Sequence, residues 1–307
     1  MDRYHLPPGI DVIERGWLSA NSIFHYGDVD VSLVDSGYCT HQKMTVDLVK
    51  RALQVHQLPA LNKVVNTHLH SDHCGGNAAL ANALDCTILI PEAEAPAVRD
   101  WNEALLSYQN LGQECPRFTA QGVLIPGQNV CLGRYQWTIL AAPGHDPHSI
   151  MLYQPQHRIL ISADALWEDG FGVVFPELWG EGGFEEVAQT LDLIETLPIA
   201  LVIPGHGKPF TNVSSALAKA RSRLDYFASD PERNTRHGAK VLLKFKLLEW
   251  RAKDLDEVAS WIKSTPALSR GAQQLNLSMD ELILWLPKSL VKAGVATIER
   301  GRLRNVD

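Results

Sequence analysis

Short apolar runs and longer stretches with helical spacing alternate over the first two thirds of the chain. The short runs, bounded by Gly, Pro, Asn or Asp, are typical of buried strands. They predict strands at residues 29–34, 64–66, 87–90, 130–132, 137–140, 150–153, 159–162 and 201–203. Apolar positions three and four apart predict helices at 42–53, 77–83, 92–108 and 184–197. Hairpin-like strand pairs followed by single helices indicate two sheets with helices outside, an α/β (α+β) fold.

The last third of the chain has a different pattern, in which helices dominate. Helical spacing predicts helices at 214–227, 238–251, 255–262 and 279–293. Residues 295–304 then predict a β-hairpin that turns at Arg300 and Gly301. A helix followed by a hairpin is the outline of a winged helix, so we expect a smaller, mainly helical, winged-helix-like domain here.

Charge supports a division at the same place. The 307 residues carry a net charge of −7, but residues 1–211 hold 11 basic and 24 acidic side chains, and residues 212–307 hold 17 and 11. We therefore predict a boundary near 210–215, with one domain at 1–211 and a second at 212–307. The negative total argues against attraction of the whole molecule to nucleic-acid phosphates.

The lack of a visible targeting signal and the pattern of cysteines favour a cytoplasmic protein. The first eight residues contain no apolar segment of a secretory signal, and no run approaches the roughly 18 apolar residues of a spanning helix. The five cysteines are odd in number and not closely paired, so we expect no disulfide framework. The sequence predicts a cytoplasmic protein with no membrane partner, and it predicts Cys39 and Cys74 as small buried side chains.

Candidate chemistry concentrates in one segment, Asn66-Thr-His-Leu-His-Ser-Asp-His-Cys-Gly-Gly76. His68 and His70 lie two apart on an extended strand end and share a face. Asp72 and His73 follow in the turn into a helix. Imidazole nitrogens and carboxylate oxygens are zinc ligands, and four of them within six residues can reach two neighbouring cations.

Three later residues fit the same site. His145 follows a strand in Ala-Pro-Gly-His, and His206 does so in Ile-Pro-Gly-His-Gly. Between them, Asp164 lies just past an apolar strand. A single Pro-Gly-His turn is often only a turn, but residues at successive strand ends gather at one edge of a sheet. The sequence therefore offers seven candidate metal ligands.

These residues resemble the metallo-β-lactamase superfamily, whose motif His-x-His-x-Asp-His stands here as His68, His70, Asp72 and His73. The resemblance covers roughly residues 10–210 and implies an αββα sandwich with the site at one edge of two facing sheets. It implies that His68, His70 and His145 hold one divalent ion. It also implies that Asp72, His73 and His206 hold a second, with Asp164 bridging the two. Zn²⁺ is the expected metal, and Fe or Mn stay open because His and Asp ligands do not separate them.

The resemblance also narrows the choice among the branches of this superfamily. True β-lactamases with two zincs place a cysteine where this chain has Asp164, whereas glyoxalase II, the acyl-homoserine lactonases and the tRNA-processing nucleases have aspartate there. Many relatives continue Gly-His-x-x-x-His, but here His148 falls one place early and Ser149 takes that position. This departure leaves the metal ligands intact and puts a substrate contact in doubt. By resemblance, Asp35 lies beneath the site, although an ordinary turn aspartate is an equal alternative.

We expect a metal-dependent hydrolase that uses a hydroxide bridging two ions to attack a small acyl substrate, a thioester or a lactone. Asp72 is the candidate catalytic residue, taking the released proton or aiming the hydroxide. The aromatic segment 167–175 could pack an apolar part of the substrate, although Phe171, Phe175 and Trp179 fit a core equally well.

Two other functions remain open. A phosphodiesterase or ribonuclease is motivated by the basic tail, with Arg300, Arg302 and Arg304 on the hairpin. Docking of this tail onto the acidic catalytic half, or completion of its pocket, is favoured over nucleic-acid binding. A ligand-binding protein of the same fold without turnover is the third alternative, and the intact ligand set argues against it.

Overall fold

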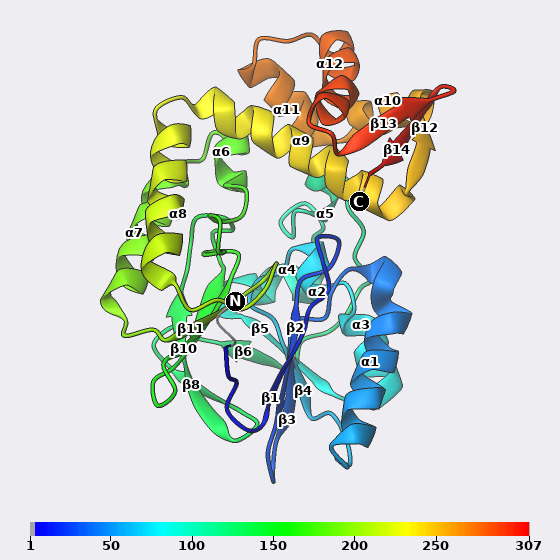
Figure 1. Ribbon diagram of the computed structural model, residues 1–307. Helices are drawn as coiled ribbons and strands as arrows, with labels where there is room; N and C mark the ends of the chain where they lie inside the picture. The colour runs from blue at the N-terminus through cyan, green and yellow to red at the C-terminus, as the bar shows by residue number, and fades with distance from the viewer. Residues whose placement is uncertain (1–3, 307) are drawn as a thin grey trace.

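The computed structural model describes residues 4–306. Two sheets lie face to face, one of six strands in the order β1-β2-β3-β4-β5-β6 and one of five in the order β11-β10-β9-β8-β7 (Figure 1). The first sheet contains β1 (Ile10–Ile13), β2 (Ser22–Tyr26), β3 (Val31–Val34), β4 (Lys63–Val65), β5 (Thr87–Pro91) and β6 (Gly122–Leu124). The second contains β7 (Asn129–Leu132), β8 (Tyr135–Ala141), β9 (Ile150–Gln154), β10 (Ile159–Ala163) and β11 (Leu201–Pro204).

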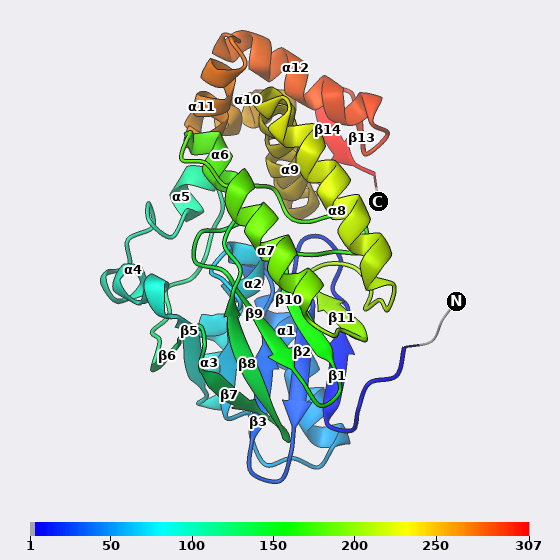
Figure 2. The ribbon, with the colours of Figure 1, turned by 90° about the vertical axis from the view of Figure 1, so that its left-hand side faces the viewer.

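Helices cover the outer face of each sheet. On the six-stranded sheet, α1 (Gln42–Val55) and α3 (Asn77–Leu84) bury their apolar faces, and on the five-stranded sheet α7 (Phe184–Thr196) and α8 (Val213–Ala228) do so. Figure 2 shows α7 and α8 in front of the second sheet. Between the sheets, Val34, Val65, Trp137, Ile161 and Ile203 pack in one cluster. The expected αββα sandwich is confirmed.

The segment between β5 and β6 departs from the prediction of one long helix at 92–108. It forms a 3₁₀ turn, η2 (Glu92–Glu94), then α4 (Ala95–Asp100), and later α5 (Tyr108–Leu111). Trp101 and Ser107 adopt positive φ angles of 51° and 67°, which a continuing helix does not permit. Val98, Leu106 and Tyr108 are buried, so these apolar positions do face the core. They do so from a folded loop and not from one helix. The single-helix prediction was wrong.

The C-terminal part is mainly helical. It contains α9 (Pro231–Trp250), β12 (Ala252–Asp254), α10 (Leu255–Ser264), α11 (Pro266–Gln274), α12 (Met279–Lys292), β13 (Ala296–Glu299) and β14 (Arg302–Asn305). The predicted hairpin is confirmed: β13 pairs antiparallel with β14, and Arg300 and Gly301 form its turn at positive φ. The strands form a small sheet in the order β12-β14-β13. The winged-helix interpretation stays a prediction.

The boundary at 211/212 also stays a prediction. Helix α8, which follows it, packs against α7, and Ala216, Leu217, Ala220 and Leu224 are buried in the cluster that covers the five-stranded sheet. Helix α9 then crosses toward the C-terminal helices (Figure 1). None of the helices described has both the length and the hydropathy that crossing a bilayer requires.

Candidate metal centre

The seven predicted ligands come together at one edge of the sandwich, five of them just past the end of a strand and two on a short helix. His68 and His70 follow β4, His145 follows β8, Asp164 follows β10 and His206 follows β11. Asp72 and His73 are carried by α2 (Ser71–Cys74), a short helix that begins directly after His70. Residues up to 138 positions apart in the chain, His68 and His206 among them, thus reach one small volume.

The ligand atoms form three overlapping groups, in each of which they lie within 4.8 Å of one another. The groups are His68, His70 and His145; His68, His73 and Asp164; and Asp72, His73 and His206. The first and third match the two sets that the resemblance implies, apart from Asp164. That carboxylate lies between them, with Oδ2 3.4 Å from His145 Nε2 and 3.9 Å from His206 Nε2.

Hydrogen bonds at the outer ring nitrogens fix how four of the five imidazoles point. His73 Nδ1 donates to Asp35 Oδ2 at 2.8 Å, His145 Nδ1 to the Val173 carbonyl at 2.6 Å, and His206 Nδ1 to the Gly16 carbonyl at 3.0 Å. His68 Nδ1 lies 3.2 Å from Thr67 Oγ1, whose own proton goes to Asp35. Each of these rings therefore turns Nε2 toward the centre of the cluster.

His70 is the fifth imidazole and has the opposite orientation. Its Nδ1 lies 2.8 Å from His145 Nε2 inside the cluster, and its Nε2 points outward to Asp146 Oδ2 at 3.7 Å. Asp146 is buried, and its Oδ1 accepts from the backbone N–H of His148 at 2.8 Å. Burial raises the pKa of the Asp146 carboxyl. Burial, and then the charge of Asp146, raises the pKa of Glu94 to about 8.

These residues fit a bound metal. His68 Nε2 and His73 Nε2 are buried and, within residues 4–306, have no hydrogen-bond partner, which is unusual for buried polar atoms. Burial lowers the pKa of His68 well below its usual range and lowers the pKa values of His70 and His145 to about 4. These three rings are therefore neutral at pH 7, the form in which imidazole binds a metal.

Around His73 and Asp164, the charges of neighbouring side chains outweigh burial in setting the pKa values. Burial would lower the pKa of His73, but Asp35 and Asp164 outweigh it and raise that pKa well above 6.5. Burial would raise the pKa of Asp164, but His73 and His206 hold it well below its usual range. Asp164 is therefore ionised at neutral pH, as a metal-binding carboxylate must be.

Asp35 lies directly beneath the ligands, as the resemblance implies, and is not an ordinary turn residue. Its carboxylate accepts from the Thr67 backbone N–H at 2.9 Å, from Thr67 Oγ1 at 2.8 Å and from His73. The residue is buried and has a φ of 58°, in the left-handed region. Asp tolerates this conformation better than most side chains, and here it directs the carboxylate at both ends of the segment that carries His68, His70, Asp72 and His73.

Two glycines allow other segments to approach the cluster. A Cβ at Gly205 would lie 2.2 Å from Asp164 Oδ1, and a Cβ at Gly172 would lie 2.4 Å from His145 Nδ1. Both distances are far inside van der Waals contact, so only glycine fits. The Pro-Gly-His turn before His206 thus needs its glycine for packing against Asp164, as well as for bending.

Aromatic side chains border the cluster, and the sequence analysis missed Trp17. Trp17 is 59% exposed and stacks on the His206 ring at a centroid distance of 5.4 Å. Trp167 meets Trp17 edge-on and donates from Nε1 to Asp164 Oδ1 at 3.1 Å. Phe175 lies against the rings of His70 and His145, whereas Phe171 is buried in the core beneath α7 and α8. An exposed indole in an irregular loop leaves no periodic signal in the sequence.

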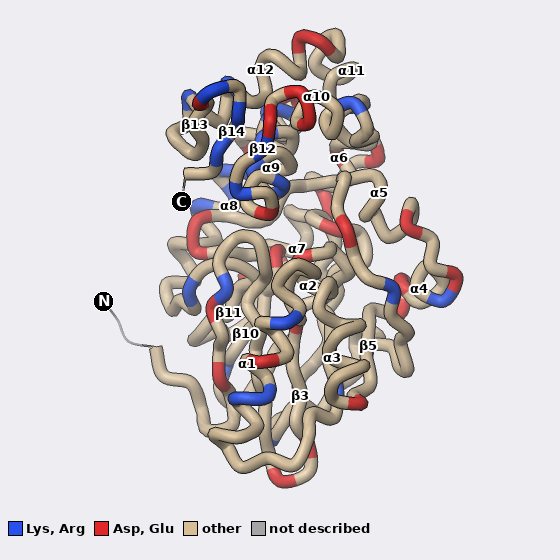
Figure 3. Tube along the Cα trace, turned by 90° about the vertical axis from the view of Figure 1, so that its right-hand side faces the viewer, with Lys and Arg blue, Asp and Glu red and all other residues tan. Residues whose placement is uncertain are grey.

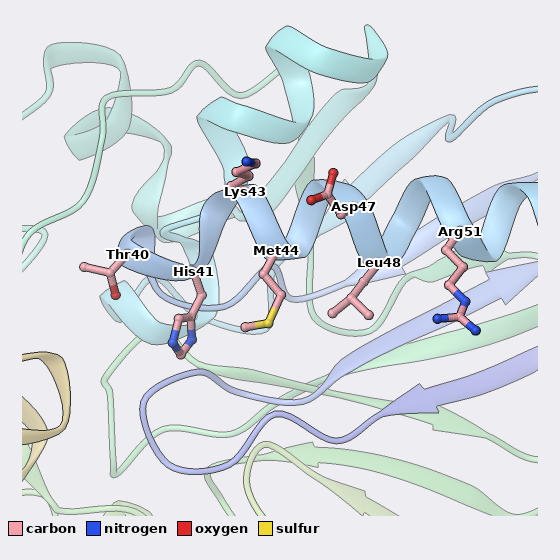
Figure 4. Close-up of a pocket in the computed structure, with 7 residues that line it drawn as sticks. All are labelled: Thr40, His41, Lys43, Met44, Asp47, Leu48 and Arg51. Carbon is pink, nitrogen blue, oxygen red and sulfur yellow. The ribbon is translucent and has the colours of Figure 1, made fainter. Parts of the chain in front are cut away.

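The positions that depart from the family pattern lie beside the centre without joining the donor groups. Ser149 is buried and His148 is exposed. A separate surface hollow lies along α1, lined by Thr40, His41, Lys43, Met44, Asp47, Leu48 and Arg51 (Figure 4). Its lining comes from one helix and the turn before it, and it contains none of the candidate ligands.

A family model described as the metallo-beta-lactamase superfamily matches residues 15–206. That range is more than half of the chain, and it includes all seven candidate ligands. The chain therefore belongs to the metallo-beta-lactamase superfamily.

Relatives of known name add detail. A hydroxyacylglutathione hydrolase from Bdellovibrio bacteriovorus is 28% identical over 141 residues, which is 45% of each chain. An acyl-coenzyme A thioesterase from Gallus gallus is 27% identical over 159 residues, 48% of this chain and 56% of that one. The chain thus spans about half the length of these curated relatives. A metallo-beta-lactamase family protein from Thermus thermophilus shares the fold with a TM-score of 0.58 and 18% identity, over 98% of this chain and 100% of its own.

Proposed function

We propose that the protein is a metal-dependent hydrolase of a small acyl substrate, a thioester or a lactone. The observation that carries the proposal is the convergence of seven donor side chains, among which His68 Nε2 and His73 Nε2 are buried without a hydrogen-bond partner in residues 4–306. The names of the curated relatives, a hydroxyacylglutathione hydrolase and an acyl-coenzyme A thioesterase, favour a thioester.

In this proposal His68, His70 and His145 hold one divalent ion, and Asp72, His73 and His206 hold a second. Asp164 lies between the two sets and would be a ligand to both ions. Zn²⁺ fits the donors, as do Fe and Mn. When bound, such ions lower the pKa of water to about 7 and polarise the oxygen of the scissile group.

Asp72 is the residue we assign to proton transfer. It is less buried than the other six donors, and its Oδ2 lies 3.1 Å from His206 Nε2. His73 and His206 outweigh burial and hold the pKa of Asp72 below its usual value, so it is ionised and able to accept a proton. Trp17 and Trp167 form an apolar wall beside His206, against which the acyl part of a substrate can pack.

Asp146 acts through His70 as a positioning residue. In Asp146→Asn the amide keeps an acceptor for the His148 N–H, but the substitution removes the carboxylate that lies 3.7 Å from His70 Nε2. We expect 10- to 100-fold weaker metal binding, about the cost of losing a carboxylate behind a metal-binding histidine. Metal competition with a chromogenic chelator measures this affinity. His148→Ala keeps the backbone N–H bond to Asp146 and is the matched control, and equal affinities in both variants would remove this role.

The position of the C-terminal part supports pocket completion over nucleic-acid binding. Helix α9 contacts two loops beside the site: Asn234 Nδ2 donates to the Val174 carbonyl at 3.1 Å, and Tyr38 Oη donates to Glu249 Oε2 at 2.9 Å. Basic residues gather instead on the small sheet (Figure 3). There Arg302 pairs with Asp254 at 3.0 Å and Arg304 with Glu299 at 3.6 Å, so acids of the same sheet offset part of their charge.

Salt dependence separates the two functions. A small substrate releases few counterions, so kcat/KM on a thioester should change less than about twofold between 50 and 300 mM salt. The triple variant in which Arg300, Arg302 and Arg304 become alanine should keep that value. Tight RNA binding that weakens steeply with salt, and whose salt slope flattens by about one unit per lost arginine, would favour the ribonuclease.

A substrate panel tests the proposal as a whole. The metal-loaded protein is assayed on S-lactoylglutathione, an acyl-coenzyme A, an acyl-homoserine lactone, a nitrocefin-like lactam, bis-p-nitrophenyl phosphate and a short RNA. We expect the highest kcat/KM on a thioester or the lactone and little turnover of the lactam. Preference for the phosphodiester or RNA would reverse the assignment, and absence of turnover on every compound would favour a ligand-binding protein of this fold.

A further inference from the structure

Two free thiols lie in contact beside the candidate metal centre. Cys74 is the last residue of α2, directly after His73, and its Sγ lies 3.7 Å from Cys115 Sγ. Cys74 is fully buried, whereas Cys115 is half-buried in a stretch without helix or strand between α5 and β6. One thiol is therefore open to reagents from solvent, and the other is within reach of the first.

The surroundings hold the two sulfurs facing each other. Cys74 Sγ lies 3.1 Å from Tyr108 Oη at the start of α5. Ser71 Oγ, at the other end of α2, donates to Gln113 Oε1 at 2.5 Å. Helix α2 is thus tied at both of its ends to Tyr108 and Gln113, which lie shortly before Cys115, and the two sulfurs lie in contact.

We propose that Cys74 and Cys115 form a modification site, at which a small disulfide such as oxidised glutathione converts the two thiols to an intramolecular disulfide. The Cys115 thiolate attacks one sulfur of the small disulfide, forming a mixed disulfide and releasing one small thiol. Cys74 Sγ then attacks Cys115 Sγ, which breaks the mixed disulfide, and the Cys74 proton leaves with the second small thiol. Two protein thiols are oxidised, and one small disulfide is reduced to two thiols.

The new bond would act on the neighbouring ligands. A disulfide requires a sulfur separation of about 2.05 Å, so the two sulfurs must move closer than 3.7 Å. Cys74 is the last residue of α2, so a movement of its backbone toward Cys115 is passed to that helix. Strain from the bond therefore falls on α2, which carries Asp72 and His73, and slower turnover follows. This consequence rests on the proposed function, whereas formation of the bond does not.

Mass spectrometry of the full-length, metal-loaded protein tests the site. All variants carry Cys131→Ser, which removes the other half-buried thiol of the described chain. After treatment with oxidised glutathione, we expect the parent to lose two hydrogen masses, with a 74–115 cross-link in unreduced peptides. In Cys74→Ser the mixed disulfide has no resolving thiol, so Cys115 should retain a glutathionyl group. In Cys115→Ser neither change should occur.

A stable glutathionyl group on Cys115 in the parent, or a cross-link from Cys115 to Cys39, would overturn the proposal. Turnover is read in parallel. We expect at least fivefold slower hydrolysis in the cross-linked parent, reversed by a phosphine reductant, and no change in Cys115→Ser. A cross-link that forms without slowing turnover would refute the effect on the centre. If the protein hydrolyses no substrate at all, the mass readout still decides the site.

Discussion

Asp164→Ala should lower kcat/KM on the preferred substrate by about a thousandfold, roughly 4 kcal/mol of transition-state stabilisation. Asp164 contacts members of both outer donor groups, with oxygens 3.4 to 3.9 Å from nitrogens of His73, His145 and His206. Without its carboxylate the two groups share no protein oxygen, and Trp167 Nε1 loses its acceptor. Steady-state kinetics together with elemental analysis should show lost turnover and the loss of at least one ion per chain.

Asp169→Ala is the matched control for this prediction. Asp169 lies five residues further along the same segment, is exposed, and pairs with Lys219 Nζ at 2.6 Å. Surface pairs of this kind contribute little, so its removal should leave both ions and normal kcat/KM. Two ions and normal turnover in Asp164→Ala would remove Asp164 from the site.

The second large effect concerns stability and pH. His25 on β2 is fully buried between the sheets, edge-on to Trp137, and neither ring nitrogen has a hydrogen-bond partner in residues 4–306. Burial lowers the pKa of His25 from 6.5 to about 3. Below pH 6.5 the His25 ring takes up a proton in the unfolded chain but stays neutral in the folded protein. The free energy of unfolding should therefore fall by about 1.4 kcal/mol per pH unit between pH 6.5 and pH 3 from this residue alone.

His25→Phe should remove that dependence and keep the aromatic contact with Trp137. Removing an unpartnered buried polar ring should also stabilise the protein by about 1–3 kcal/mol at pH 7.5. Denaturant unfolding of both proteins from pH 7.5 to 5.0 should give curves that diverge as the pH falls. The exposed His157, replaced by Phe, is the control and should leave the wild-type slope unchanged. Parallel curves for His25→Phe and wild type would show that His25 is not buried in its neutral form.

Much of the site could be predicted from the sequence, because its parts are local or end a strand. His68, His70, Asp72 and His73 lie within six residues, and strand ends supply the rest. Asp146 could not be identified, because only the outward direction of His70 Nε2 distinguishes it from any aspartate after a turn. The thiol pair was missed for a similar reason: Cys74 and Cys115 are 41 residues apart, and folding alone brings them together.

Prediction of the fold succeeded where the periodicity of apolar residues was strong, and it failed where packing set the conformation. Helices α1, α7, α8 and α12 have wide apolar faces and lie within a few residues of their predicted bounds. Helix α11 was missed because its buried stripe is narrow, with small residues such as Ala267, Gly271 and Ala272. Strand β2 was missed because all of its first four residues are buried, including polar Ser22 and His25, so it shows no alternation.

The most direct test of the account is a metal titration of the chelator-stripped protein, read as the rate of thioester hydrolysis. Seven donors, arranged as two sets with Asp164 between them, predict that the rate rises with added Zn²⁺ and stops rising at two equivalents per chain. They also predict that removal of both ions abolishes hydrolysis. Full activity in the stripped protein, or a rate that is complete at one equivalent, would contradict a hydrolase built on two metal ions.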